Sequence, residues 1–286
     1  MHELHDKKLK LLEEKAVVIR EEIIKMLIKA GSGHSAGSLG LVDIFTAFYF
    51  HILNHKPKSP NWPNRDRLIL SNGHVCPARY ATMAEAGYFS KTKLATLRKL
   101  GSPLQGHPEP RRLSGLETTS GPLGEGSSQA AGLAYAAKMN KAKWRVYCIL
   151  SDGELQEGQT WEALMFAAKY KLNNCTFIVD RNNIQIEGTT EDVMPLEPLA
   201  KKFRAFNFHV EECAGNNIRD FVKAVERAQE ITEQPTIIIA YTIPGRGVDF
   251  MENKFEWHGK IPTGQEAKLA LHELRTLQGQ IKSEHE

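Results

Sequence analysis

Short apolar runs rich in β-branched and aromatic residues alternate along this chain with longer segments of helical periodicity. The short runs are residues 67–70, 146–150, 176–179, 208–210 and 236–240. Runs of this length and composition are typical of strands. The helical segments among them are residues 78–86, 127–140, 160–172 and 218–232. This alternation predicts an α/β fold, in which a parallel β-sheet is flanked by helices on both faces.

Further helical segments lie before the first of these strands and after the last. Apolar residues recur at helical spacing over residues 9–30, and Gly31 is a typical residue at a helix end. Residues 41–53 and 264–282 also have the pattern of helices. A chain of 286 residues, of which 41% are hydrophobic, can bury a substantial core. Since no repeat or linker interrupts the pattern, we expect one domain over residues 1–286.

Charge, hydropathy and cysteine content exclude several classes of protein. The 37 basic and 34 acidic residues leave a net charge of +3, which does not indicate a nucleic-acid partner. No segment has the apolar length needed to cross a bilayer, and residues 1–15 lack the apolar core of a signal peptide, so we expect a cytoplasmic protein with no membrane partner. The cysteines form no CxxC pair, and we expect them to be reduced and structural: Cys76, Cys148, Cys175 and Cys213.

Polar residues follow two neighbouring strands of the predicted sheet. Asp152 and Gly153 come after the strand 146–150, and Asn182 follows the strand 176–179. Neighbouring parallel strands joined by one helix bring their carboxyl ends together, so Asp152 and Asn182 are expected to converge on one ion. Magnesium prefers hard oxygen ligands and usually takes one carboxylate together with phosphate oxygens. Gly153 would let the backbone approach a phosphate closely.

A simpler interpretation of the same residues also exists. Asp-Gly and Asn-Asn pairs are among the commonest turn signals, and each alone is compatible with an ordinary strand end. The two pairs together, however, are similar to the signature of enzymes that bind thiamine diphosphate. That signature usually begins with Gly, where this chain has Ser151. The departure concerns the geometry of the turn more than the ligands, because Asp152, Gly153 and Asn182 are all present.

Six segments resemble consecutive motifs of the transketolase family, in the family's order. They are GSGHSAGSL from Gly31, LSNGH from Leu70, GHPE from Gly106, SGPLGEG from Ser120, SDGELQEG from Ser151 and DRNNIQIEG from Asp180. The resemblance covers nearly the whole chain, and roughly the first half of the family's proteins. It implies a thiamine-diphosphate-binding domain of the diphosphate type over residues 1–286, with thiamine diphosphate as the cofactor. It also implies that the pyrimidine-binding and C-terminal domains are absent.

The resemblance assigns roles to four histidines. His34 and His258 would lie near the reacting carbonyl oxygen and His107 near the terminal hydroxyl of the donor. His74 would lie beside the cofactor, which His258 would also contact. Ketol transfer moves protons near neutral pH, where imidazole can both donate and accept them. The competing interpretation is that a lone histidine after glycine in a loop is an ordinary surface or core residue.

The remaining site residues also come from the resemblance. Gly121 and Leu123 would hold the aminopyrimidine ring, and Ile186 would form an apolar wall. The backbone carbonyl of Ile184 would join Asp152 and Asn182 as a ligand of Mg²⁺, or of Ca²⁺ or Mn²⁺ in its place. Glu157 corresponds to an acid that meets its counterpart across a subunit interface. A solvated charge at a helix N-terminus is the alternative for Glu157.

These features predict a transketolase subunit that transfers a two-carbon ketol group from a ketose phosphate, such as xylulose 5-phosphate, to an aldose phosphate. The partner would be a second chain with the pyrimidine-binding and C-terminal domains, in an assembly with two copies of each chain. Alternatives are half of a related enzyme, either 1-deoxyxylulose-phosphate synthase or the α-subunit of a 2-oxo-acid dehydrogenase, and a non-catalytic cofactor-binding subunit. Unphosphorylated, sulfonated and branched sugars also remain open as substrates.

Overall fold

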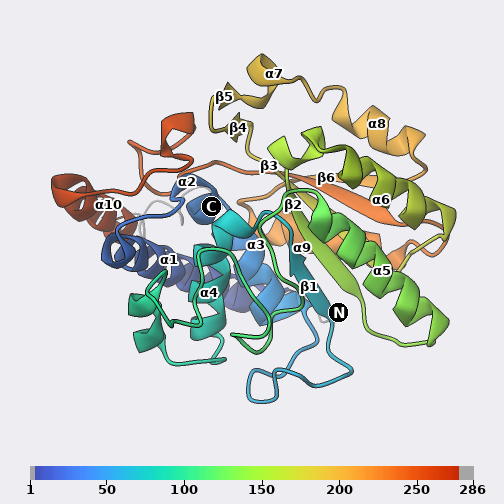
Figure 1. Cartoon of the computed structure of the whole chain (residues 1–286), viewed down its shortest axis with the longest axis horizontal. Helices are drawn as coiled ribbons and strands as arrows, with labels where there is room; N and C mark the ends of the chain where they lie inside the picture. The colour runs from blue at the N-terminus through green and yellow to red at the C-terminus, as the bar shows by residue number, and fades with distance from the viewer. Residues whose placement is uncertain (1–3, 277–286) are drawn as a thin grey trace.

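The computed structural model describes residues 4–276, which form one parallel five-stranded sheet covered by helices on both faces (Figure 1). The strand order is β1-β2-β3-β7-β6, and all four neighbouring pairs are parallel. The strands are β1 (Arg67–Leu70), β2 (Val146–Ser151), β3 (Cys175–Arg181), β6 (His209–Ala214) and β7 (Thr236–Tyr241). The α/β fold class expected from the sequence is confirmed.

The central strands are apolar because both of their faces are covered. Every residue of β2 and β3 is buried. Alternate residues of β2 point into two different cores, with Tyr147 and Ile149 in one and Cys148 and Leu150 in the other. A strand of this kind is a continuous apolar run, since neither face is left to water.

Two groups of helices cover the two faces. One core contains α1 (Asp6–Ala30), α3 (Val42–Ala47), α4 (Cys76–Glu85), α9 (Ile218–Glu230) and α10 (Gly264–Thr276). The other contains α5 (Glu125–Met139), α6 (Gly158–Lys169) and α8 (Leu199–Ala205). The figure shows α5 and α6 in front of the sheet on one side, and α1 and α4 on the other (Figure 1).

Most helix boundaries lie within a few residues of those expected. α1 ends at Gly31, whose φ of 77° is the left-handed conformation that glycine adopts readily. α6 ends before the predicted residue 172, because Lys171 has a φ of 48°. The helix expected over residues 41–53 is α3 followed by the π-helical turn η1 (Phe48–Ile52). The part of the closing helix expected at residues 277–282 lies outside the described residues.

The sequence patterns did not indicate several short elements. These are α2 (Ala36–Gly40), the hairpin of β4 (Ile184–Gln185) and β5 (Gly188–Thr189), α7 (Thr190–Val193) and α8. Short 3₁₀ segments are η2 (Gly73–Val75), η3 (Lys91–Thr96), η4 (Gly153–Gln156) and η5 (Phe255–Trp257). Several of them lie directly after strands, where they shape the loops at the carboxyl edge of the sheet.

The cysteines are buried, as expected for structural residues. All four are also free. Among residues 4–276, no helix combines the length and apolar character that a membrane span requires.

Candidate active site

A cavity of about 460 Å³ lies at the carboxyl edge of the sheet, and most of the site residues expected from the sequence line it. We call it the histidine cavity. Its lining comprises His34, Gly37, His74, His107, Gly121, Leu123, Ser151, Gly153, Glu154, Asn182, Ile184, Gln185, Ile186, Glu187, Val193 and His258. Segments far apart in the sequence meet here because parallel strands all end at the same edge.

Asp152 lies between the lining residues Ser151 and Gly153 in sequence, but it is fully buried and is not itself part of the lining. The register of β2 against β3 pairs Ser151 with Asp180, so Asp152 and Asn182 follow neighbouring strand ends as the sequence predicted. Asp152 accepts hydrogen bonds from the backbone N–H groups of Gly153 (2.8 Å) and Asn183 (2.6 Å). Asn183 has a φ of 68°, a left-handed conformation that Asn tolerates better than most residues. The second residue of the Asn-Asn pair therefore suits the shape of the loop.

Ser151, the departure from the usual signature, fits this turn without strain. It is the last residue of β2, its φ is not positive, and it lines the histidine cavity. Its backbone N–H donates to Glu154 Oε2 at 3.1 Å. Because the position does not need a left-handed backbone, glycine is not required there, and a serine hydroxyl is added to the cavity wall.

Two buried carboxyl groups lie at the ends of β2 and β3, and one of them already has a cationic partner in Arg181. Burial raises the pKa of Asp152 to about 6 and that of Asp180 to about 7, and the charge of Asp152 is a further cause for Asp180. Arg181 Nη1 lies 3.1 Å from Asp152 Oδ2, and Asn182 donates to Asp180 at 2.9 Å. Two buried carboxyl groups close together are stabilised by nearby positive charge.

These residues fit a magnesium ion that takes part of its coordination from a ligand. The described residues contain no cluster of three or more His, Cys, Asp or Glu that would enclose a metal. Asp152 and Asn182 offer one carboxylate and one amide oxygen, and Ile184 lies on the cavity wall next to Asn182 Oδ1, which accepts its N–H at 3.1 Å. Such a partial set suits Mg²⁺, which usually completes its shell with phosphate oxygens and water.

Three of the expected histidines form a cluster in the lining of the histidine cavity. The ring centroids of His34 and His74 are 4.9 Å apart, and that of His258 lies 5.7 Å from His34 and 5.1 Å from His74. Burial, followed by the charges of His258 and Arg98, lowers the pKa of His34 to about 4. Burial also lowers the pKa of His258, and it lowers that of His74 well below its usual value. The cluster is therefore uncharged at neutral pH.

His107 reaches the cavity from a different loop and lies against Gly121. A Cβ on Gly121 would lie 3.5 Å from the His107 ring, and the φ of Gly121 is 147°, so this position suits glycine. Burial and the charge of Arg98 lower the pKa of His107. The loop that carries Gly121 thus presents bare backbone beside an uncharged imidazole, which leaves room for a planar ring.

The remaining expected residues lie at the rim. Leu123 is 38% exposed and Ile186 is 71% exposed, although both line the cavity. Glu157 is exposed at the N-cap of α6, next to Gly124, and does not line the cavity. Its position is compatible with either of the two interpretations that the sequence left open.

Residues 13–277 of this chain match the family model of the transketolase domain that binds thiamine diphosphate. The chain belongs to the transketolase family. Solved transketolases also resemble it in structure, with a TM-score of 0.86 and 36% identity for the enzyme from Campylobacter jejuni, over 93% of this chain and 43% of that one. The transketolase from Leishmania mexicana gives a TM-score of 0.85 at 28% identity, over 96% of this chain and 45% of that one.

Curated relatives include separate transketolase subunits as well as full-length transketolases. One subunit of the apulose-4-phosphate transketolase from Actinobacillus succinogenes is 42% identical, over 92% of this chain and 96% of the relative. The 6-deoxy-6-sulfo-D-fructose transketolase subunit SqwG of a Clostridium species is 41% identical, with the same two coverages. Human transketolase is 38% identical over 91% of this chain, which spans 41% of the human protein.

Glu154 is a further residue of this transketolase site that sequence reasoning did not single out. It is fully buried and accepts hydrogen bonds from Ser71 and from the N–H groups of Gly124 (2.6 Å) and Ser151 (3.1 Å). It thereby joins the loop after β1, the start of α5 and the end of β2. The Ser-x-x-Glu spacing of residues 151–154, which is typical of a capping box, was the signal available in the sequence.

Two buried polar atoms on the cavity wall are left without partners among residues 4–276. They are Nδ1 of His34 and Nε2 of Gln185. Buried polar groups are nearly always hydrogen-bonded, so unsatisfied atoms that face a cavity indicate where a ligand or water completes the network. Both residues belong to the lining of the histidine cavity.

Proposed function

We propose that this chain binds magnesium and thiamine diphosphate and, with a second polypeptide, transfers a two-carbon ketol unit from a ketose phosphate to an aldose phosphate. One observation carries the proposal. The four histidines, Gly121 and Asn182 come from loops throughout the chain and line one cavity, and the β2–β3 register sets the buried Asp152 beside the strand end that Asn182 follows. An arrangement needed only for folding would not bring uncharged imidazoles and hard oxygen ligands to the same space.

In this proposal, different residues of the site bind the metal ion, the diphosphate and the aminopyrimidine ring. Asp152, Asn182 and the carbonyl of Ile184 would hold the metal ion, and Gly153 would admit the diphosphate. The bound cofactor supplies a carbon nucleophile that can attack a carbonyl group and hold the resulting negative charge. Leu123 would hold the aminopyrimidine ring at the rim of the cavity, together with Gly121, and Ile186 would add an apolar wall.

The histidines would transfer protons and bind the hydroxyl groups of the substrate. Because their pKa values are lowered, they are neutral at physiological pH, and each imidazole can accept a proton at one nitrogen while donating from the other. His34 and His258 would act at the reacting carbonyl oxygen. His107 would bind the terminal hydroxyl of the donor, and His74 would orient the cofactor.

The comparisons support a partner chain and leave the sugar open. Two relatives are named as transketolase subunits, and this chain covers 96% of each. Their names give apulose 4-phosphate for one and 6-deoxy-6-sulfo-D-fructose for the other. Both sugars carry an anionic group, so we propose a ketose with an anionic end as the donor class and xylulose 5-phosphate as its first test. Exposed apolar residues at the rim, such as Ile186, suit contact with the partner.

The test is a coupled assay of ketol transfer from xylulose 5-phosphate to ribose 5-phosphate. It compares this chain, its candidate partner and the mixture, each with thiamine diphosphate and magnesium, and repeats the mixture with sulfonated and branched ketoses. We expect activity from the mixture only. Asp152→Ala should abolish both activity and calorimetric binding of the cofactor. A cofactor-loaded complex that is inactive on every sugar would instead support the non-catalytic subunit, and full activity from this chain alone would disprove the need for a partner.

A further inference from the structure

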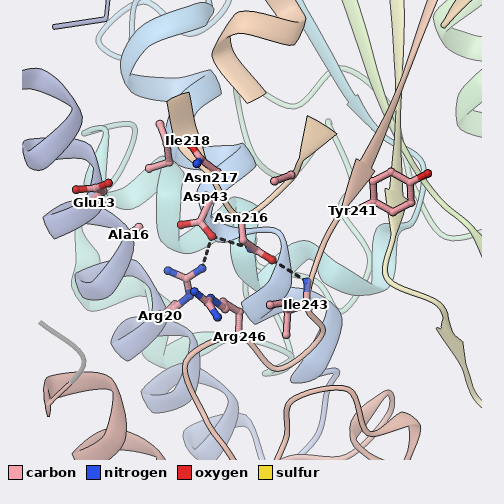
Figure 2. A pocket seen from close by; sticks show the side chains of 11 residues that line it. Glu13, Ala16, Arg20, Asp43, Asn216, Asn217, Ile218, Tyr241, Ile243 and Arg246 are labelled. Atoms are coloured by element: carbon pink, nitrogen blue, oxygen red, sulfur yellow. Dashed lines mark hydrogen bonds and ion pairs between the residues drawn. The ribbon is translucent and has the colours of Figure 1, made fainter. Parts of the chain in front are cut away.

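A second cavity, of about 340 Å³, lies at the same carboxyl edge of the sheet, where β6 and β7 end (Figure 2). We call it the arginine cavity. It is lined by Glu13, Ala16, Arg20, Asp43, Ala214, Asn216, Asn217, Ile218, Tyr241, Ile243 and Arg246. Among the described residues, none lines both this cavity and the histidine cavity. Ligands of α/β proteins bind at this edge, so its position already favours a binding site.

Two guanidinium groups line this cavity from distant parts of the sequence. Arg20 comes from the middle of α1, and Arg246 comes from the loop after β7 (Figure 2). Arg20 is only 3% exposed, and its Nη2 lies 2.5 Å from Asp43 Oδ2. Arg246 Nη1 lies 3.8 Å from Glu252, which is not part of the lining. Two arginines on one cavity wall are typical of sites that bind phosphate or carboxylate groups.

One hydrogen-bond donor of Arg20, its Nε–H, has no acceptor among the described residues. This nitrogen is also buried. Leaving a buried donor of a charged group without an acceptor is destabilising. The nearest acid, Asp43, already accepts from Arg20 Nη2 and from Asn216 Nδ2 (2.7 Å). An oxygen atom of a ligand in the cavity would satisfy this donor.

The rest of the lining shapes the cavity. Asn216 donates to Gly40 O at 2.8 Å and accepts from the Ile243 N–H at 2.7 Å, so its amide links the end of α2 to the loop after β7. Ile218, where α9 begins, places the positive end of a 13-residue helix dipole beside the cavity. Glu13, at another part of the lining, would accept hydrogen bonds from hydroxyl groups of a ligand.

We propose that the arginine cavity binds a small phosphorylated ligand, with its phosphate between Arg20 and Arg246 and its hydroxyl groups toward Glu13. A phosphate has more acceptor oxygens than a carboxylate, and the donors come from separate elements, which suits a tetrahedral group better than a planar one. The proposal is independent of the proposed ketol transfer, since it concerns a different cavity and needs neither activity nor a partner chain.

The test is calorimetric titration of the whole chain with inorganic phosphate, in a phosphate-free buffer with excess thiamine diphosphate and magnesium to occupy the histidine cavity. We expect saturable binding that Arg246→Gln weakens about tenfold or more, because a charge-assisted hydrogen bond is lost. Arg246→Lys should have a smaller effect. Arg204→Gln is the matched control, since Arg204 also lies 3.8 Å from a glutamate but is exposed on α8.

Several outcomes would overturn the proposal. Binding that does not saturate, or that Arg246→Gln leaves unchanged, would show that the cavity is not a phosphate site. An equal loss in Arg204→Gln would show that only overall charge matters. A parallel titration with acetate tests whether the cavity prefers phosphate to carboxylate. If acetate bound as tightly as phosphate, and Arg246→Gln weakened both equally, the ligand group would be a carboxylate and the proposal of a phosphate would be wrong. Thermal unfolding of each variant establishes that it is folded.

Discussion

Arg98 is held in an unusual conformation beside two histidines of the site. Its φ is 58°, uncommon for a residue other than glycine, and a Cβ on Gly106 would lie 2.9 Å from its Nε. No carboxylate within the described residues lies within ion-pair distance of Arg98. Burial is the largest cause of the lowered pKa of His34 and His107, and the charge of Arg98 lowers both further. Strained positions of this kind are common at functional sites. We interpret Arg98 as a positioning residue that helps to keep these imidazoles neutral.

Arg98→Gln should therefore raise the pKa of His107 and His34, because the protonated imidazoles are no longer repelled by the positive charge of Arg98. The acidic limb of kcat/KM against pH, measured on the assembled enzyme, should move to higher pH. NMR titration of the histidine ring protons should show the same direction without catalysis. The neighbouring exposed Lys99→Gln serves as the charge-matched control, and an acidic limb that is the same in both variants would exclude this role.

His107→Ala should reduce ketol transfer by about 10²–10⁴-fold, the usual effect of losing one positioned acid, base or hydrogen-bonding group. His107 is not one of the expected ligands of the metal ion or the diphosphate, so cofactor affinity measured by calorimetry should stay nearly unchanged. If turnover of xylulose 5-phosphate were unaffected, the role inferred from the family would be wrong. If cofactor binding were lost as well, His107 would be a structural residue of the Gly121 loop.

How far single residues can be predicted depends on how local their environment is. Asp152 and Asn182 could be placed together because each follows a strand, and the parallel register then brings them side by side. Glu154 could not be recognised in this way, since its partner Ser71 is 83 residues away and the pairing depends on how two loops pack. Arg98 was missed for the same reason.

At the level of secondary structure, α6 gives a direct test of packing against the sheet. Leu164 is fully buried in the core beside β2 and β3, whereas its neighbour Met165 is 54% exposed. Leu164→Ala should lower the free energy of unfolding of the isolated chain by about 2–5 kcal/mol, the range found for such truncations in cores. Met165→Ala should change it by less than about 0.5 kcal/mol. Urea unfolding measures both, and equal effects would contradict the assignment of the buried face.

Long periodic elements were predictable, and short ones were not. Four strands were located over most of their length because buried parallel strands leave continuous apolar runs in the sequence. The edge strand β6 (His209–Ala214) is mostly not buried, so the expected run 208–210 covered only its first two residues. The hairpin of β4 and β5 has two residues in each strand, too few for any alternation to show. α2 has five residues that include Gly37 and Gly40, which weaken any helical signal. These short elements nevertheless form much of the wall of the histidine cavity. The sequence therefore predicted the sheet and its long helices better than the shape of the cavity.

At the scale of the whole molecule, the predicted assembly is two copies of this chain with two of its partner. Analytical ultracentrifugation of the mixture should give the mass of this four-chain assembly. Each pair of unlike chains is expected to bury an interface of about 2,000 Å² or more. Ile186→Asp, at the exposed rim of the histidine cavity, should weaken association by about tenfold or more. Val18→Asp, at an exposed position of α1, is a control of similar chemistry. Association that both variants leave intact would place the interface elsewhere.

α2 is a single helical turn shared by two cavities. On one side Gly37 lines the histidine cavity, and a Cβ there would lie 2.9 Å from a methyl group of Val75. On the other side Gly40 accepts a hydrogen bond from Asn216 of the arginine cavity, and a Cβ there would lie 2.9 Å from the carbonyl oxygen of Ile243. For protein engineering, this means that neither cavity can be reshaped through α2 alone. A library that enlarges side chains next to His34 to accept new sugars will need compensating changes around Asn216.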